Sequence, residues 1–207
     1  LMVETFSSDP TLDACFGEYT VYPFHRNFAT VYKNLVHHFT HQTSREEAQT
    51  FWAGCGAVKT EPYFQVGGFD ESFAAASVED IDLGYRLKAA GKRILLNKKL
   101  QVTHGKRYTL LSLVRSDLFD RAIPWTKLMA RRNVFTADLN LRWTNVVSGL
   151  LLVLGPPLVA AFAFTFGVER LWMPAVVGFL FYLVLNGPIL GFVMRRKGPL
   201  FFIPFFL

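Results

Sequence analysis

Two adjacent carboxylates, Glu79 and Asp80, form the part of the sequence with the clearest capacity for acid–base chemistry. Ser77 and Asp80 have the three-residue spacing of a capping box, and Gly91 stands where a helix starting there would end. Both carboxylates would then lie in the first turn, where unpaired backbone N–H groups and the helix dipole favour negative charge. Asp80 is therefore predicted to be ionised at neutral pH and able to accept a proton as a general base. The alternative is that Glu79 and Asp80 only cap the helix.

The elements that must position these carboxylates alternate between strands and helices. An apolar stripe predicts a helix over residues 27–42, and Gly67 and Gly68 predict a turn before the carboxylate helix. Short apolar runs predict strands over 12–22, 51–60, 93–96 and 101–104. This order indicates an α/β layer architecture. It contains no glycine-rich phosphate loop of the GxGxxG or GxxxxGK type.

Segment 110–129 has apolar side chains in steps of three and four, with charged side chains opposite. The apolar face consists of Leu111, Val114, Leu118, Ala122, Trp125 and Met129. Pro124 removes one backbone donor, so we expect it to divide the segment into two helices. The segment either lies in the headgroup plane of a membrane, with Trp125 at the interface, or packs as a core helix.

Two uncharged apolar stretches follow, 143–167 and 171–194, and each is long enough to cross a bilayer. Basic residues flank the pair on both sides, at Arg131, Arg132 and Arg142 and at Arg195, Arg196 and Lys197. By the positive-inside rule both ends face the cytoplasm. We therefore predict a multi-pass protein of the cytoplasmic (inner) membrane, with the lipid bilayer as a partner. These residues explain much of the net charge of +6, so no nucleic-acid partner is predicted.

Four parts are thus expected along the chain. Residues 1–108 form a soluble α/β part on the cytosolic side, and 109–142 form an amphipathic interfacial segment. Residues 143–194 contain two transmembrane helices, and 195–207 begin a further apolar segment.

Several motifs, taken in order, resemble a known family. They are Phe51-Trp52-Ala53-Gly54-Cys55-Gly56-Ala57, Val66-Gly67-Gly68-Phe69-Asp70-Glu71, Glu79-Asp80-Ile81-Asp82-Leu83 with Arg86, then His104, Arg121 and Trp125 before two membrane spans. Together they resemble the C-terminal half of a membrane-bound family 2 glycosyltransferase with the GT-A fold. The match covers residues 1–207, and its most specific part is the Gly-Gly-Phe-Asp-Glu run followed by the Glu-Asp pair.

The resemblance implies an inverting transfer of a hexose from a nucleotide-sugar donor to a membrane-associated or lipid-linked acceptor. Asp80 matches the family's general base, which takes the proton from an acceptor hydroxyl as that oxygen attacks the anomeric carbon. Glu79 would orient the acceptor or brace the helix. The substrate-binding residues implied are Glu79, Trp52, Gly54, Gly56, Gly67, Gly68, Arg121 and Trp125. Arg121 and Trp125 are reminiscent of a Gln-x-x-Arg-Trp element, although their spacing differs; the alternative role is interfacial anchoring.

The resemblance also implies a divalent cation, Mg²⁺ or Mn²⁺, held by an Asp-x-Asp motif that would meet the leaving diphosphate. Asp80-Ile81-Asp82 has the same letters but lies where the family keeps its base, so we expect the main ligands upstream of Leu1. His104 matches a position that meets the metal or diphosphate in some members; its alternative role is structural. His37 and His41, beside His38, could bind zinc, but the sequence favours a solvated helix face.

Two rival functions are compatible with the same residues. One is a non-catalytic membrane scaffold derived from a glycosyltransferase. The other is a processive polysaccharide synthase whose spans form a channel, although two or three spans are few for a pore.

Overall fold

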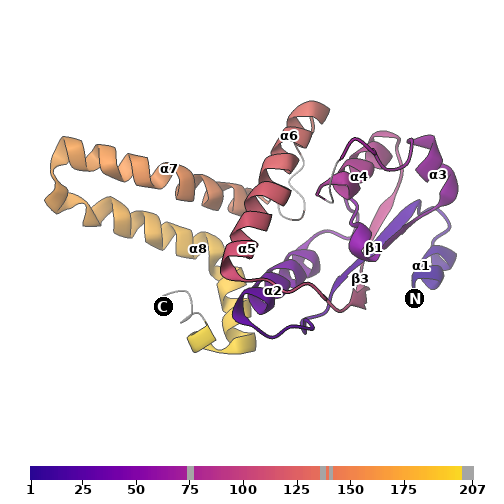
Figure 1. Cartoon of the computed structure of the whole chain (residues 1–207), viewed down its shortest axis with the longest axis horizontal. Coiled ribbons are helices and arrows are strands. Elements are labelled where there is room, and N and C mark those ends of the chain that lie inside the picture. Colours follow the sequence, from indigo (N-terminus) through magenta and orange to yellow (C-terminus); the bar gives the residue numbers. More distant parts are fainter. Residues whose placement is uncertain (74–76, 136–138, 140–141, 202–207) are drawn as a thin grey trace. The chain divides into compact units, whose positions relative to one another are not determined.

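The chain folds into two compact units, Leu1–Asp138 and Leu139–Leu207 (Figure 1). The computed structural model describes residues 1–73, 77–135, 139 and 142–201. The first unit is a mixture of helices and a small sheet, and the second is a pair of long apolar helices. The predicted α/β composition is therefore confirmed, and most of the chain is helical.

A three-stranded sheet forms the centre of the first unit. Strand β1 (Ala14–Tyr19) lies between β2 (Gly56–Val58), which is antiparallel to it, and β3 (Ile94–Val102), which is parallel. The start of β1 is completely buried and supplies much of the core. Sequence predicted two strands over 93–96 and 101–104, but the structure has one. Pairing with β1 shifts register opposite Gly17 and then resumes, so the strand bends without ending.

Four helices accompany the sheet in the first hundred residues (Figure 1). They are α1 (Met2–Ser8), α2 (Phe28–Thr43), α3 (Thr60–Gln65) and α4 (Glu79–Ala89), with a short 3₁₀ turn at Ala53–Cys55. The predicted helix over 27–42 is confirmed within a residue at each end. Its side chains Val31 and Leu35 are buried, in agreement with the apolar stripe.

The C-terminal end of α4 agrees with the prediction from sequence, and its N-terminal end does not. Gly91 adopts a φ of 73°, and Lys92 N–H donates to the Leu87 carbonyl at 3.0 Å, which is the expected C-terminal glycine motif. The capping box is wrong, because the N-cap is Val78 and no side chain caps it. Ser77 Oγ instead donates to the carbonyl of Asp120 at 2.7 Å.

This bond ties the chain that enters α4 to the segment around Pro124, 43 residues later. The predicted division of this segment into two α-helices is confirmed, and the second helix begins at Ile123, next to Pro124. Pro124 lies in the first turn of α6 (Ile123–Arg132), where a missing N–H is tolerated. The stretch before it is a π-helix over Ser116–Ala122, which follows α5 (Leu110–Arg115).

The π-helix divides the predicted apolar stripe. Leu111, Val114 and Leu118 are exposed, whereas Trp125 is buried together with Leu128. A π-turn takes more residues than an α-turn, so it rotates the face that follows it relative to the face that precedes it. Segment 110–132 belongs to the first compact unit. Leu113, Trp125 and Leu128 pack in the interior, as the core-helix alternative expects, and a position in the headgroup plane stays a prediction.

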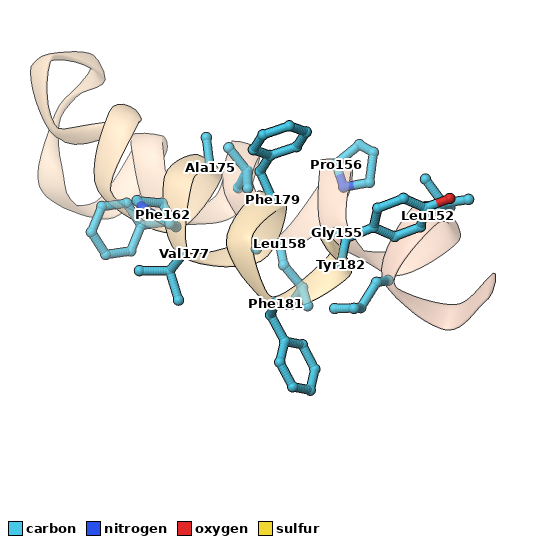
Figure 2. Close-up of a pocket in the computed structure, with 14 residues that line it drawn as sticks. Leu152, Gly155, Pro156, Leu158, Phe162, Ala175, Val177, Phe179, Phe181 and Tyr182 are labelled. Carbon is cyan, nitrogen blue, oxygen red and sulfur yellow. The ribbon is translucent and has the colours of Figure 1, made fainter. Parts of the chain in front are cut away.

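The second unit is a helical hairpin of α7 (Trp143–Phe166) and α8 (Trp172–Lys197) joined by a short turn. Within the described residues, two helices are long and apolar enough to cross a membrane, and these are the two. They indicate membrane association. Asn186 Nδ2 donates to Ser148 Oγ at 2.9 Å, which links the helices through polar side chains. An apolar groove of about 850 Å³ lies between them. Figure 2 shows residues that line it, among them Gly155, Pro156 and Tyr182.

Candidate functional site

Asp80 is held at the first turn of α4 by two backbone amides. Its Oδ2 accepts the N–H of Ala53 at 3.0 Å, and its Oδ1 accepts the N–H of Ile81 at 2.8 Å. Gly84, one turn later, makes the first contact possible, since a Cβ there would overlap the backbone of Thr50 and Phe51. The absence of that atom lets α4 approach the 50–53 segment closely enough for Ala53 to reach the carboxylate.

Burial raises the pKa of Asp80 above its ordinary value of 3.8, and this is the largest influence on it. The Ala53 amide opposes that rise, the neighbouring Glu79 adds to it, and the Ile81 amide and the Arg121 charge oppose it. The prediction from sequence rested only on the helix terminus, which favours the ionised carboxylate. In the structure, desolvation of Asp80 outweighs the effect of the helix terminus and raises the pKa towards the range where a general base works best.

Glu79 lies beside Asp80 but faces another partner. Its Oε2 accepts the backbone N–H of Ser77 at 2.6 Å, so the carboxylate fixes the chain where it enters α4. This contact matches the bracing role that we considered for Glu79. Its other predicted role, orienting an acceptor, stays a prediction.

A cluster of aromatic and imidazole rings adjoins the carboxylate. The centroid of the Tyr19 ring lies 4.2 Å from that of His104, 4.6 Å from His37 and 4.8 Å from Trp52. The His37 and His41 rings are 4.1 Å apart. We call Tyr19, His37, His41, Trp52 and His104 the ring cluster. It brings together residues from β1, α2, the 50–53 segment and the end of β3.

The α2 histidines were expected on a solvated face, and that prediction is wrong. His37, His38 and His41 are all buried. His38 Nδ1 lies 2.9 Å from the Tyr19 carbonyl and His41 Nδ1 lies 3.2 Å from the Gly17 carbonyl, so this face of α2 packs on β1. Sequence also gave Tyr19 no role. The available signal was its place within the predicted strand of residues 12–22, close to that strand's end.

Burial is the main reason why these imidazoles stay uncharged at neutral pH. It lowers the pKa of His41 and that of His104 to about 4, and it lowers the pKa of His37 well below 6.5. The charge of Arg121 acts in the same direction on all three. The charge of Arg121, which the π-helix carries, therefore acts on both the ring cluster and Asp80. The roles that the resemblance implies for Arg121, Trp52 and His104 stay predictions.

The glycines at 54 and 56 serve the packing of neighbouring rings. A Cβ on Gly54 would overlap the Trp52 indole, and one on Gly56 would overlap the Phe51 ring. Gly56 and Ala53 also border a pocket of about 280 Å³ beside the Asp80 segment, whose apolar wall includes Tyr63, Phe69 and Leu83. A contact of either glycine with a substrate stays a prediction.

Three of the residues predicted to bind substrate, Gly67, Gly68 and Trp125, have other positions in the structure. Gly67 and Gly68 adopt φ values of 83° and 66°, which confirms the turn. Gly67 borders a polar hollow of about 420 Å³ with Arg86 and Arg132, and Asp80 is not part of its lining. Trp125 Nε1 donates to Tyr85 Oη at 2.9 Å in the interior, so its ring anchors α6 on α4.

The described residues do not fit a resident metal ion. Among residues 1–73, 77–135, 139 and 142–201, no three His, Cys, Asp or Glu side chains converge to hold one. His104, the predicted contact, is buried among rings, and its Nδ1 has no hydrogen-bond partner there. His37 and His41 on α2 likewise have no third His, Cys, Asp or Glu ligand for zinc among the residues that the structure describes.

Comparisons of the chain with protein-family models, with curated proteins and with solved structures found no match.

Proposed function

We propose that the chain carries the acceptor side of an inverting glycosyltransferase, with Asp80 as its general base. The observation that supports this most is the state of Asp80: a half-buried carboxylate, fixed by two backbone N–H groups, with a raised pKa. A residue that only capped a helix would not need contact with a segment 27 residues away. The resemblance of the surrounding motifs to family 2 enzymes of the GT-A fold supplies the reaction.

In the proposed reaction the acceptor hydroxyl gives its proton to Asp80 as its oxygen bonds to the anomeric carbon. The bond from that carbon to the diphosphate oxygen breaks, and the configuration inverts. Arg121 directs a positive charge to the same region and would stabilise the charge on the diphosphate. Trp52 and Tyr19 would border the bound sugar with ring faces.

A divalent cation, Mg²⁺ or Mn²⁺, is part of the proposal because a leaving diphosphate carries high negative charge. When bound, such an ion would neutralise that charge. The described residues offer no ligand set for it, so no step above passes through a metal.

The acceptor is proposed to be lipid-linked or otherwise held at the membrane. Two apolar helices of spanning length follow the site, and basic residues flank them on both sides. By the positive-inside rule, the proposed location of the first unit is the cytosolic face of the cytoplasmic membrane. Holding the site at the lipid surface would raise the local concentration of a lipid substrate.

Replacement of Asp80 by Asn in the complete gene product tests the proposal. Membranes would be incubated with radiolabelled UDP- and GDP-hexoses, and the labelled lipid extracted. We expect the Asp80→Asn variant to lose about 10²- to 10⁴-fold in transfer rate, since general-base catalysis contributes that much. Glu46→Gln, at an exposed carboxylate outside the quoted motifs, is the matched control. Unchanged transfer by Asp80→Asn would reject the mechanism and favour the scaffold function.

A further inference from the structure

Two connections of the first unit run beside one another along one edge. The first, residues 20–27, joins β1 to α2, and the second, 103–109, joins β3 to α5 (Figure 1). Phe24 N–H donates to the His104 carbonyl at 3.0 Å, and Asn27 Nδ2 donates to the Tyr108 carbonyl. Tyr108 N–H donates to Thr30 Oγ1 at 2.8 Å. The backbone of this edge is therefore fixed by hydrogen bonds.

Large apolar side chains project outward from this fixed backbone. Tyr22 is 69% exposed and Phe24 is 73% exposed, while Pro23 between them is buried. Leu111, at the adjoining start of α5, is 79% exposed. Leu110 and Val114 are exposed beside it. We call Tyr22, Phe24, Leu110, Leu111 and Val114 the edge patch.

The charges around the edge patch have one sign. Arg26, Lys106, Arg107 and Arg115 are all exposed, and segments 20–27 and 103–115 contain no Asp or Glu. The next acidic residue, Asp117, forms an ion pair with Lys33. A surface that combines exposed aromatic and leucine side chains with unopposed cations is complementary to an anionic lipid surface.

The chain also keeps the first unit within reach of any membrane that α7 and α8 cross. Only residues 133–142 separate the end of α6 from the start of α7. Ten residues span at most about 33–36 Å, so the first unit is tethered at the bilayer. A bilayer is thus a partner within reach that matches both the apolar and the charged features of the patch.

We propose that the edge patch docks on the anionic surface of the bilayer, with Phe24 and Leu111 inserted between headgroups. The patch adjoins the ring cluster, since Tyr22 lies three residues after Tyr19 and Phe24 N–H donates to the His104 carbonyl. Docking there holds the ring cluster next to the headgroups. The inference rests on exposure and charge, and it is independent of the proposed sugar transfer.

The test uses the full chain reconstituted in vesicles of equimolar phosphatidylserine and phosphatidylcholine. A polarity-sensitive fluorophore would be attached at Phe24→Cys or Leu111→Cys in a Cys55→Ala background. Cys15 stays unlabelled, because it is fully buried and burial raises its pKa to about 11. Spin-labelled lipids then quench any probe that enters the headgroup region. The matched control is Phe64→Cys on α3, where the native side chain is 70% exposed.

We expect quenching at positions 24 and 111 to exceed that at 64 by roughly twofold or more. Neutralising Arg26, Lys106 and Arg107 to Gln should reduce the excess, as should vesicles of phosphatidylcholine alone. Equal quenching at 24 and 64 overturns the proposal. A blue-shifted probe at 24 without lipid quenching would indicate a protein partner and also overturns it. Adding Asp80→Asn should leave quenching unchanged, which separates this result from the fate of the proposed catalysis.

Discussion

Arg132 and Asp82 join α6 to α4 through an ion pair whose carboxylate is buried. The Nε and Nη2 atoms of Arg132 each lie 2.8 Å from Oδ1 of Asp82, whose carboxylate is fully buried. The other oxygen, Oδ2, accepts Nε of Arg86 at 2.8 Å. One carboxylate therefore holds two guanidinium groups, and it fixes the helix that carries Trp125.

Replacing Asp82 by Asn should strongly destabilise the fold. Removing one partner of a buried pair leaves uncompensated charge, which typically costs about 3–5 kcal/mol. For a chain of this size that corresponds to a fall in Tm of roughly 6–20 °C. Arg132→Gln should cost less, because Arg86 still pairs with Asp82 and Arg132 is partly exposed. Thermal unfolding of the full chain in detergent would measure both variants, and equal effects would contradict this order.

The pH dependence of activity should report the raised pKa of Asp80. A base must be ionised, so kcat/KM should fall as pH decreases through that pKa, which lies above 3.8. The Arg121 charge lowers the pKa of Asp80, so Arg121→Gln should move this acidic limb to higher pH. The measurement is the pH at which kcat/KM falls on the acidic side of the profile, and the maximal rate is not used. Arg45→Gln, at an exposed residue far along the chain, should leave the limb in place.

Gly84→Ala should separate α4 from the segment that binds Asp80. The added methyl group would overlap the Phe51 and Thr50 backbone, and such overpacking typically costs about 1–3 kcal/mol. We expect a lower Tm and a loss of transfer activity, because the Ala53–Asp80 contact is weakened. Gly105→Ala is the matched control, since its Cβ would meet no atom within 4 Å. If both substitutions gave the same Tm, the close approach at Gly84 would have no energetic role.

Stability should fall as the solution is acidified, because His41 is buried without charge. Its pKa is lowered from 6.5 to about 4, so the unfolded chain binds the proton first. The stability that is present above pH 6.5 is therefore lost progressively towards pH 4, by about 3 kcal/mol for this residue. His41→Phe should reduce the loss of Tm between these pH values, while His25→Phe, at a half-exposed position, should not. Parallel pH profiles for wild type and His41→Phe would argue against this assignment.

Sequence determined the features that depend on neighbours along the chain. The apolar stripe of residues 27–42, the turn at Gly67 and Gly68 and the C-terminal glycine Gly91 were all predicted. The two apolar helices at the C-terminal end followed from their length and lack of charge. Each of these depends on local spacing or composition, which sequence contains in full.

Tertiary packing decided the features that join distant residues. Ser77 has the spacing of a cap, yet its hydroxyl donates to the Asp120 carbonyl, 43 residues away in the chain. The histidines of α2 are spaced as on a solvated face, yet they pack on β1 and form a ring cluster with Tyr19 and His104. The raised pKa of Asp80 likewise comes from its burial, which outweighs the opposing hydrogen bond from Ala53. Desolvation and long-range partners depend on how elements pack in three dimensions, so spacing along the chain cannot specify them.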